Sequence, residues 1–479
     1  MKNTFYITTT LPYVNADPHL GHALEFVHAD IIARYKRLLG QEVFFNIGTD
    51  EHGQKILEKA TLEGTEVQEY VDHYAERFRQ FADMLAISYT NFIRTTDPAH
   101  IAAAQEFWKR CSAQGDIYKK LYKVKYCVGC ELEKTDSELE NGKCPVHPTT
   151  PIETIEEENY FFRFSNYGKK LLALYESNPS FVLPGSRLNE IRAFVGRGLQ
   201  DFSISRLKEK MPWGVEVPGD KDQVMYVWFD ALVNYVSAIG WPADGEKFEK
   251  WWPVIQMAGK DNLRQQAAMW QAMLFSAGIA PSKQIIIHGF ITSGGQKMSK
   301  SVGNVVDPAD IVKEYGVDAL RYYLAREITP FEDGDFTHER FKEAYNANLA
   351  NGLGNLTSRI MKMATSYDIK ATEETRALTL EGLYPHPLTN EHLENFQIDR
   401  AMDEIWTKGV QNLDSYIQRE QPFKKIKEDK EGAKRDIEYL LFHLRGIALQ
   451  LYPFMPDTAK KIDDAVMNHV MPDPLFLRK

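Results

Sequence analysis

The sequence predicts an α/β protein in which a parallel sheet is split by an insertion and followed by a domain of helices. Strand-like and helix-like runs alternate over residues 1–115. The alternation stops over 116–220, where aromatic, charged and turn-forming residues dominate, and it resumes over 221–335. From 336 to 479 only amphipathic helical patterns remain. We therefore expect two halves of one sheet domain, an insertion between them and a C-terminal helical domain.

Each expected element has a local signal. Short apolar and β-branched runs predict strands over 4–10, 43–48, 88–94, 253–258 and 284–290. Apolar residues at helical spacing predict helices over 21–39, 53–86, 97–114, 341–365, 397–417 and 435–452. Strands that alternate with helices in this way form βαβ units, and such units build parallel sheets.

The first chemical signal lies where the first strand passes into the first helix. Residues 18–22 read Pro-His-Leu-Gly-His, which places His19 and His22 at a helix N-terminus. Free N–H groups and the helix dipole favour a phosphate there. Gly21 lets a nucleotide lie close to the backbone. Taken alone, this pattern is typical of an ordinary loop-to-helix junction.

A second signal follows the expected strand 284–290. Gly294 and Gly295 precede the sequence Lys-Met-Ser-Lys-Ser at 297–301. A mobile basic loop suits a catalyst that closes on a triphosphate and releases pyrophosphate. Ammonium groups and imidazoles can stabilise negative charge that develops on a phosphate during a reaction. Neither a GxxxxGK[ST] nor a GxGxxG motif is present, so kinase, P-loop NTPase and dehydrogenase functions lack their sequence support.

The composition is that of a large globular protein, with 43% hydrophobic and 26% charged residues. No apolar run approaches the length of a membrane span, and no signal peptide is visible. We therefore expect a cytoplasmic protein with no membrane partner. The net charge of −10 does not favour nucleic acid, so any nucleic-acid partner should dock on a local basic surface.

Three of the four cysteines lie in one short window of the expected insertion. Cys127-x2-Cys130 and Cys144-x2-His147 are separated by 13 residues. This spacing fits four tetrahedral ligands for one Zn²⁺ ion, within a knuckle over about 122–150. Four protein ligands leave no open position, which predicts a structural zinc. Cys111 stands apart, and we expect it to be a core residue.

Together, the two basic motifs resemble the HIGH and KMSKS motifs of class I aminoacyl-tRNA synthetases. Essentially the whole chain is similar to methionyl-tRNA synthetases, through the stretches 11–15, 48–53, 159–163, 201–206, 227–232 and 354–359. This resemblance implies a split Rossmann-type nucleotide-binding domain, a zinc-knuckle connective insertion and an α-helical anticodon-binding bundle. It also implies that L-methionine and ATP, with Mg²⁺, form methionyl-adenylate, from which the methionyl group passes to tRNA(Met).

The resemblance assigns site residues as well. The catalytic residues implied are His19, His22, Lys297 and Lys300, and ATP binding adds Gly21, Gly259, Asp261 and Ser299. The methionine site implied comprises Leu11, Tyr13, Asp50, Arg206, Trp228, Ala231, Leu232, Tyr235, Asn262 and Gln266. Asp50 follows an apolar strand, at the end where α/β sheets bind ligands, and its carboxylate should pair with the substrate ammonium. Arg206 should lie near the substrate carboxylate and phosphate.

Some positions depart from the family pattern. The family often has an apolar residue at 262 and commonly a histidine at 266, near the substrate sulfur, where this chain has Asn262 and Gln266. Glutamine can still donate a hydrogen bond, so the pocket could keep a polar group. Some members have proline in place of Leu232.

In the C-terminal helices, Asn355 and Arg359 are four residues apart on one helical face. They match the residues that read the CAU anticodon. Phe423 takes the place of the family's stacking tryptophan and still offers an aromatic face to a base. Lysines and an arginine within 424–435 could contact phosphates.

Other functions remain possible on the sequence alone. Synthetases for isoleucine, valine or leucine share this core but carry a long editing insertion, for which 116–220 leaves no room. A cysteinyl enzyme needs a zinc-binding cysteine just before the first motif, and that region has none. A non-catalytic zinc-knuckle RNA-binding protein would explain Cys127 to His147 but not the paired ATP motifs. No appended domain of the kind that dimerises some family members is seen, which predicts a monomer.

Overall fold

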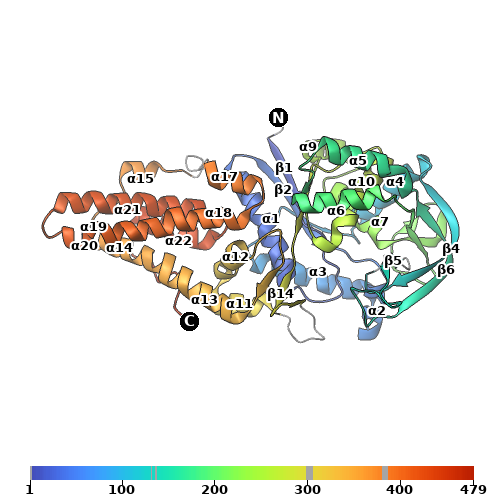
Figure 1. Ribbon diagram of the computed structural model, residues 1–479, viewed down its shortest axis with the longest axis horizontal. Coiled ribbons are helices and arrows are strands. Elements are labelled where there is room, and N and C mark those ends of the chain that lie inside the picture. Colours follow the sequence, from blue (N-terminus) through green and yellow to red (C-terminus); the bar gives the residue numbers. More distant parts are fainter. Residues whose placement is uncertain (1–2, 131, 135–137, 298–305, 380–386) are drawn as a thin grey trace.

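The computed structural model describes residues 3–130, 132–134, 138–297, 306–379 and 387–479. Figure 1 shows an elongated molecule with a sheet-containing domain at one end and a bundle of long helices at the other. Within the described residues, no helix is long and apolar enough to cross a membrane.

The centre of the first domain is a six-stranded parallel sheet in the order β3-β2-β1-β12-β13-β7. Its strands are β1 (Thr4–Thr8), β2 (Glu42–Thr49), β3 (Asn91–Arg94), β7 (Val182–Leu183), β12 (Ile255–Gly259) and β13 (Gln284–His288). Ile7 of β1 pairs with Ile255 of β12, so segments separated by more than half of the chain form one sheet. The predicted α/β class and the split sheet are confirmed.

Helices cover this sheet and connect its strands (Figure 1). They are α1 (Leu20–Leu38), α2 (Gln54–Glu63), α3 (Val67–Met84), α4 (Pro98–Ala113), α5 (Gly168–Ser177), α6 (Gly185–Gly196), α7 (Val227–Ala231), α8 (Asn234–Ser237), α9 (Gly245–Trp251) and α10 (Trp270–Ser276). The shorter turns η2 (Phe164–Tyr167), η3 (Lys260–Asn262) and η4 (Gln265–Met269) lie between them. The single helix expected over 53–86 is two helices, because Gly64 adopts a left-handed conformation that ends α2.

The region expected as an insertion forms two small antiparallel sheets. A long hairpin of β4 (Ile117–Cys127) and β6 (Ile152–Phe162) is flanked by β5 (Leu132–Lys134) and β8 (Phe202–Ser203). The second sheet holds β9 (Ser205–Leu207), β10 (Glu216–Val217) and β11 (Asp220–Met225). Within the expected bounds 116–220, β7 pairs with β13 of the central sheet. A strand of two residues is too short to give a sequence pattern.

After β13 the chain leads into the helical domain. A small sheet is formed by β14 (Ile291–Ser293), β15 (Gln296–Lys297) and β16 (Gly334–Phe336), next to α11 (Pro308–Tyr315) and α12 (Val317–Arg326). The helical domain contains α13 (His338–Ala344), η5 (Tyr345–Gly354), α14 (Asn355–Ser366), α15 (Glu373–Ala377), α17 (Pro387–Glu394), α18 (Ile398–Glu404), η6 (Ile405–Gln411), α19 (Asn412–Glu420), α20 (Pro422–Lys425), α21 (Lys430–Leu451) and α22 (Pro456–Asn468). The predicted C-terminal helical bundle is therefore confirmed.

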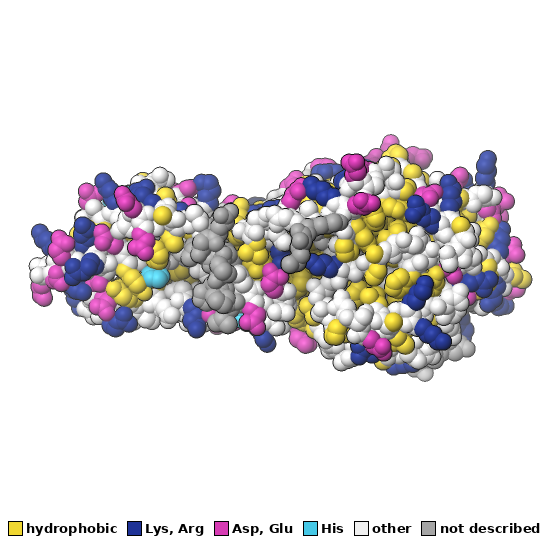
Figure 2. All heavy atoms as spheres, turned by 90° about the horizontal axis from the view of Figure 1, so that it is seen from above, with side chains coloured by type: hydrophobic (Ala, Val, Ile, Leu, Met, Phe, Trp, Pro, Cys, Tyr) yellow, Lys and Arg dark blue, Asp and Glu magenta, His cyan; other side chains and the backbone are white. Residues whose placement is uncertain are grey.

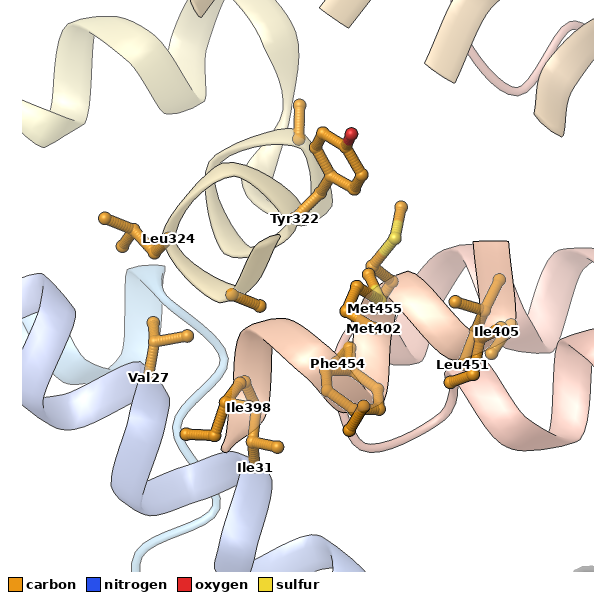
Figure 3. Close-up of a cluster of buried hydrophobic side chains, with 14 of the residues drawn as sticks. Val27, Ile31, Tyr322, Leu324, Ile398, Met402, Ile405, Leu451, Phe454 and Met455 are labelled. Atoms are coloured by element: carbon orange, nitrogen blue, oxygen red, sulfur yellow. The ribbon is translucent and has the colours of Figure 1, made fainter. Parts of the chain in front are cut away.

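One continuous apolar core joins the two domains. Figure 3 shows side chains from α1, α12, α18, η6 and the α21–α22 junction that meet in this core: Val27, Ile31, Tyr322, Leu324, Ile398, Met402, Ile405, Leu451, Phe454 and Met455. Arg321 of α12 is fully buried there, and its guanidinium bonds Asp30 of α1 at 2.7 Å and the Phe454 carbonyl at 2.8 Å. The helical domain is therefore packed against α1 through buried apolar and polar contacts.

Replacing Arg321 with methionine should lower the free energy of unfolding by about 3 kcal/mol, because buried Asp30 and the Phe454 carbonyl lose a partner. Arg34 still bonds Asp30 at 2.7 Å, which limits the loss. Urea denaturation followed by circular dichroism measures the change. The control variant Arg340→Met removes an exposed arginine and should shift stability by less than about 0.5 kcal/mol. Equal stability of the two variants would show that the buried contacts of Arg321 do not stabilise the packing between the domains.

Candidate active site

A cavity of about 430 Å³ opens at the carboxyl ends of the central strands. Its walls come from the loop after β1, the first turn of α1, the end of β2, helices α7 and α8, and the ends of β12 and β13. Fourteen residues expected in the site line it: Leu11, Tyr13, His19, Gly21, His22, Asp50, Trp228, Ala231, Leu232, Tyr235, Gly259, Asp261, Asn262 and Gln266. In Figure 2, apolar side chains gather in the middle of one face of the sheet domain.

His19 and His22 cap the N-terminus of α1, whose first turn lines the cavity. The side chain of His19 accepts a hydrogen bond from the Gly21 N–H, and His22 Nδ1 accepts one from the His19 N–H, both at 3.1 Å. Because backbone N–H groups only donate, both Nδ1 atoms are unprotonated and each neutral ring carries its proton on Nε2. The rings stack with centroids 3.9 Å apart. Burial, and then the neighbouring His19, hold the pKa of His22 well below its usual range, so His22 is a neutral donor.

Asp50 lies at the end of β2, only 7% exposed. Its N–H donates to the Pro12 carbonyl at 2.9 Å, and its carbonyl accepts from the Val14 N–H at 3.2 Å. These bonds fix the loop that carries Tyr13 beside the Asp50 carboxylate. Gly53 permits the arrangement, because it adopts a φ of +114° and a Cβ there would lie 2.2 Å from the Tyr13 hydroxyl.

The deeper wall is apolar and aromatic. Ala231 of α7, Leu232 directly after it and Tyr235 of α8 are buried, and Trp228 packs beside them. Gln266 enters from η4, and its Nε2 donates to the Tyr235 hydroxyl at 2.8 Å. Asn262 lies next to Asp261, and its amide donates to the Asp261 carboxylate at 3.2 Å.

The sequence analysis missed a buried ion pair in the cavity wall. His288 Nε2 lies 2.8 Å from a Glu25 carboxylate oxygen, and His288 Nδ1 lies 2.7 Å from the Gly289 carbonyl. An imidazolium can donate to both of these oxygens at once. Burial alone would lower the pKa of His288, but the hydrogen bond and charge of Glu25 raise it above its usual value. The other Glu25 oxygen accepts from the Thr10 hydroxyl at 2.7 Å. The sequence feature that could have revealed this pair is the Glu25 carboxylate, which lies on the buried face of the first helix.

Arg206 is not among the residues that line this cavity. It faces a separate hollow of about 190 Å³, which Tyr126, Glu157 and Tyr226 also line. Its Nη1 donates to the Ser203 hydroxyl at 2.7 Å and to the Ser205 carbonyl at 2.8 Å. Arg206 belongs to β9 of the small sheets, and its role near the substrate carboxylate and phosphate stays a prediction.

The second basic motif is described only at its start. Lys297 ends β15, whose Gln296 pairs with Ser293 of β14. Ser299 and Lys300 lie outside the described residues.

The predicted metal ligands form one cluster. The ligand atoms of Cys127, Cys130, Cys144 and His147 all lie within 4.8 Å of one another. Cys130 Sγ is 3.4 Å from Cys144 Sγ and 3.2 Å from His147 Nδ1. Gly129 is needed there, because a Cβ would meet the His147 ring at 2.4 Å. Three thiols and an imidazole at these separations fit a tetrahedral zinc ion.

This cluster lies against the cavity. Cys130 lines the cavity, and Lys55 Nζ donates to the Gly129 carbonyl at 2.7 Å. Cys111, in contrast, is fully buried in the sheet-domain core as expected, and burial raises the pKa of its thiol to about 12.

The three residues matched to anticodon recognition lie in the helical domain. Asn355 begins α14 and is exposed, and Arg359 one turn later bonds the Asp414 carboxylate of α19. Phe423 of α20 is 41% exposed, and Lys424 Nζ lies 5.8 Å from its ring centre.

Comparisons with known proteins agree with this geometry. The family model of class I tRNA synthetases (M) matches residues 5–150 and 132–361, and the model of the anticodon binding domain of methionyl tRNA ligase matches 370–474. The methionine–tRNA ligase of Thermotoga maritima is 41% identical over 474 residues, which cover 96% of this chain and 74% of that protein. That of Synechocystis is 42% identical over 478 residues, covering 96% and 88%.

A solved structure of Mycobacterium tuberculosis methionyl-tRNA synthetase in complex with methionyl-adenylate superposes with a TM-score of 0.90 at 40% identity. It covers 97% of this chain and 94% of that one. The resemblance of the sequence motifs is thus confirmed over nearly the full length: the chain belongs to the methionyl-tRNA synthetase family of class I aminoacyl-tRNA synthetases.

Proposed function

We propose that the cavity binds methionine and ATP side by side and is where this ligase forms methionyl-adenylate. The enzyme attaches L-methionine to tRNA(Met) with ATP, releasing AMP and pyrophosphate. One observation supports this use of the cavity. The buried Asp50 carboxylate, the imidazole N–H groups of His19 and His22 and an apolar wall all face one space of about 430 Å³. That space suits an amino acid whose carboxylate must approach a phosphate.

Methionine would enter with its ammonium group beside Asp50. The apolar wall of Trp228, Ala231 and Leu232 would pack against the thioether, which binds mainly through such contacts. Tyr13 would close the side of the pocket above Asp50. The substrate carboxylate would then point toward the first turn of α1, where the phosphate is expected.

ATP would lie over the first turn of α1, next to Gly259 and Asp261. His19 and His22 each offer an Nε2–H, which can donate to the charge that develops on the α-phosphate. Lys297, Ser299 and Lys300 would add donors and positive charge. Mg²⁺ is bound mostly by substrate phosphates in such sites and would neutralise part of their charge.

The Cys127–His147 cluster would hold one structural Zn²⁺ ion, because its four ligands leave no open position. Replacing Cys144 with alanine should reduce bound zinc from one ion per chain to nearly none, as measured by atomic absorption after dialysis. Cys111→Ala is the matched control and should keep the full zinc content. A Cys144→Ala protein that retains one zinc, or a native protein that binds none, would contradict the assignment.

The helical domain would bind the tRNA anticodon through Asn355, Arg359 and Phe423. Single-stranded bases can be hydrogen-bonded at their edges and stacked on aromatic side chains. Lys and Arg are interspersed with Asp and Glu over the helical end in Figure 2, so phosphate contacts would be local. We further propose that the enzyme acts as a monomer in the cytoplasm, where tRNAs are charged for translation.

The test is ATP–pyrophosphate exchange measured with each of the twenty amino acids. Exchange with methionine alone is the expected result. Exchange with a different amino acid would keep the mechanism and overturn the substrate. The absence of exchange with any amino acid would instead favour the RNA-binding alternative.

A further inference from the structure

We propose that Gln256, which does not line the cavity, is a positioning residue for methionine selection. It turns the amide of Gln266 so that this end of the pocket offers hydrogen-bond donors. The pocket thereby favours a side chain that accepts a hydrogen bond but donates none, as a thioether does. The inference rests on the placement of methionine in the cavity that is proposed above.

The argument starts from two backbone groups whose roles are fixed. The Ser282 N–H donates to Gln271 Oε1 at 3.0 Å, and the Gln266 carbonyl accepts from Gln271 Nε2 at 2.8 Å. A backbone N–H can only donate and a carbonyl can only accept. These two bonds therefore determine which end of the Gln271 amide is oxygen and which is nitrogen.

The orientation of Gln271 then determines where the Ser282 hydroxyl proton points. Gln271 Nε2 also donates to Ser282 Oγ at 3.2 Å, so the serine proton points elsewhere. It is directed to Gln256 Oε1, 2.5 Å away. Gln256 must therefore present its nitrogen on the other side, where Nε2 donates to Gln266 Oε1 at 2.7 Å. If the Gln256 amide were flipped, the Ser282 hydroxyl would lose its acceptor. Leaving a buried donor without a partner costs free energy.

The last link reaches the cavity. With its oxygen occupied by Gln256, Gln266 presents Nε2 to the Tyr235 hydroxyl at 2.8 Å. Tyr235 accepts there, and both residues line the cavity. Burial raises the pKa of Tyr235, and the phenol stays protonated. The Tyr6 hydroxyl bonds the Tyr235 carbonyl at 3.0 Å and helps to hold the residue in place.

The hydrogen-bond relay from Gln271 through Ser282, Gln256 and Gln266 to Tyr235 is buried from solvent. Gln256 and Gln271 are fully buried, Gln266 and Tyr235 are 1% exposed, and Ser282 is 4% exposed. Water cannot easily replace a partner at these positions, so the direction of the relay is kept when substrates exchange. In this proposal, the Tyr235 O–H and the second N–H of Gln266 are the donors offered to the substrate side chain. Methionine sulfur is a weak acceptor with no proton, whereas a methylene in its place accepts nothing.

The experiment compares methionine with norleucine, in which a methylene replaces the sulfur. The Gln256→Met variant keeps the length of the side chain but removes the donor that holds Gln266, which can then turn its oxygen toward the pocket. The ratio of kcat/KM for methionine to that for norleucine in ATP–pyrophosphate exchange should fall about fivefold to tenfold. The change should appear in KM for methionine, while KM for ATP stays the same. Ser282→Ala, a smaller change, should shift the ratio in the same direction.

The control is Gln284→Met, which removes a glutamine at the start of the neighbouring strand, where its amide bonds the Ser180 carbonyl. It should leave the ratio unchanged, and a thermal melt checks that each variant folds. An unchanged ratio in both folded relay variants, or an equal loss for the two amino acids, would overturn the role of Gln256. If the native protein gave no exchange with methionine, the proposed site itself would fail, which is a different result.

Discussion

Replacing Lys300 with alanine should slow methionyl-adenylate formation by about 10²–10³-fold while KM for methionine changes little. The expected size is that of removing one preorganised donor from charge that develops in a transition state. Lys300 belongs to the second basic motif, and the charge it would stabilise appears only as the carboxylate attacks the α-phosphate. Single-turnover formation of the adenylate, followed by rapid quench, measures this step without product release.

The matched control for Lys300 is Lys313→Ala. Lys313 is an exposed lysine on α11, close in sequence to the motif. Its loss should leave the single-turnover rate unchanged. If Lys300→Ala formed adenylate at a near-normal rate, the catalytic role of the motif would be refuted. If KM for methionine rose instead, the lysine would act in binding rather than in the transition state.

Replacing Asp50 with asparagine should raise KM for methionine by about 10²-fold or more, because the substrate ammonium would lose its counter-charge in a buried place. Breaking a buried charge pair by removing one partner typically costs about 3–5 kcal/mol. Asparagine has nearly the same shape, so the loop contacts of the Asp50 backbone with Pro12 and Val14 should survive. KM for ATP should change little. Steady-state ATP–pyrophosphate exchange measures both constants.

A substrate analogue makes the Asp50 test specific. 4-(Methylthio)butanoate has the methionine side chain and carboxylate but no ammonium group. It should inhibit the native enzyme and Asp50→Asn equally, whereas methionine should distinguish them. An exposed aspartate, Asp222, serves as the control, and Asp222→Asn should resemble the native enzyme. Equal losses for methionine and the analogue would show that Asp50 supports the fold rather than the ammonium.

Much of this architecture could be predicted because its signals are local. The helix that begins at Leu20 follows from apolar spacing, and its capping histidines are adjacent in sequence. The CxxC and CxxH arms gave the ligand cluster, since both arms lie within one hairpin region. Asp50 could be placed because the end of a parallel strand is a position that the sequence reveals.

What could not be predicted depends on residues far apart in the chain. Glu25 and His288 are 263 positions apart, and only the fold brings them within hydrogen-bond distance. The hydrogen bond that Gln256 donates to Gln266 depends on how η4 packs against β12, which no spacing rule describes. A motif match gives the identity of Arg206 but not the hollow that its short strand faces, which only the fold reveals.

The most direct test of the central claim is a crystal structure of this chain with a non-hydrolysable methionyl-adenylate analogue. The account predicts that the analogue fills the cavity, with its ammonium beside Asp50, its thioether against Trp228 and its phosphate over the first turn of α1. Binding of the analogue elsewhere, or in the cavity with the ammonium turned away from Asp50, would contradict the account.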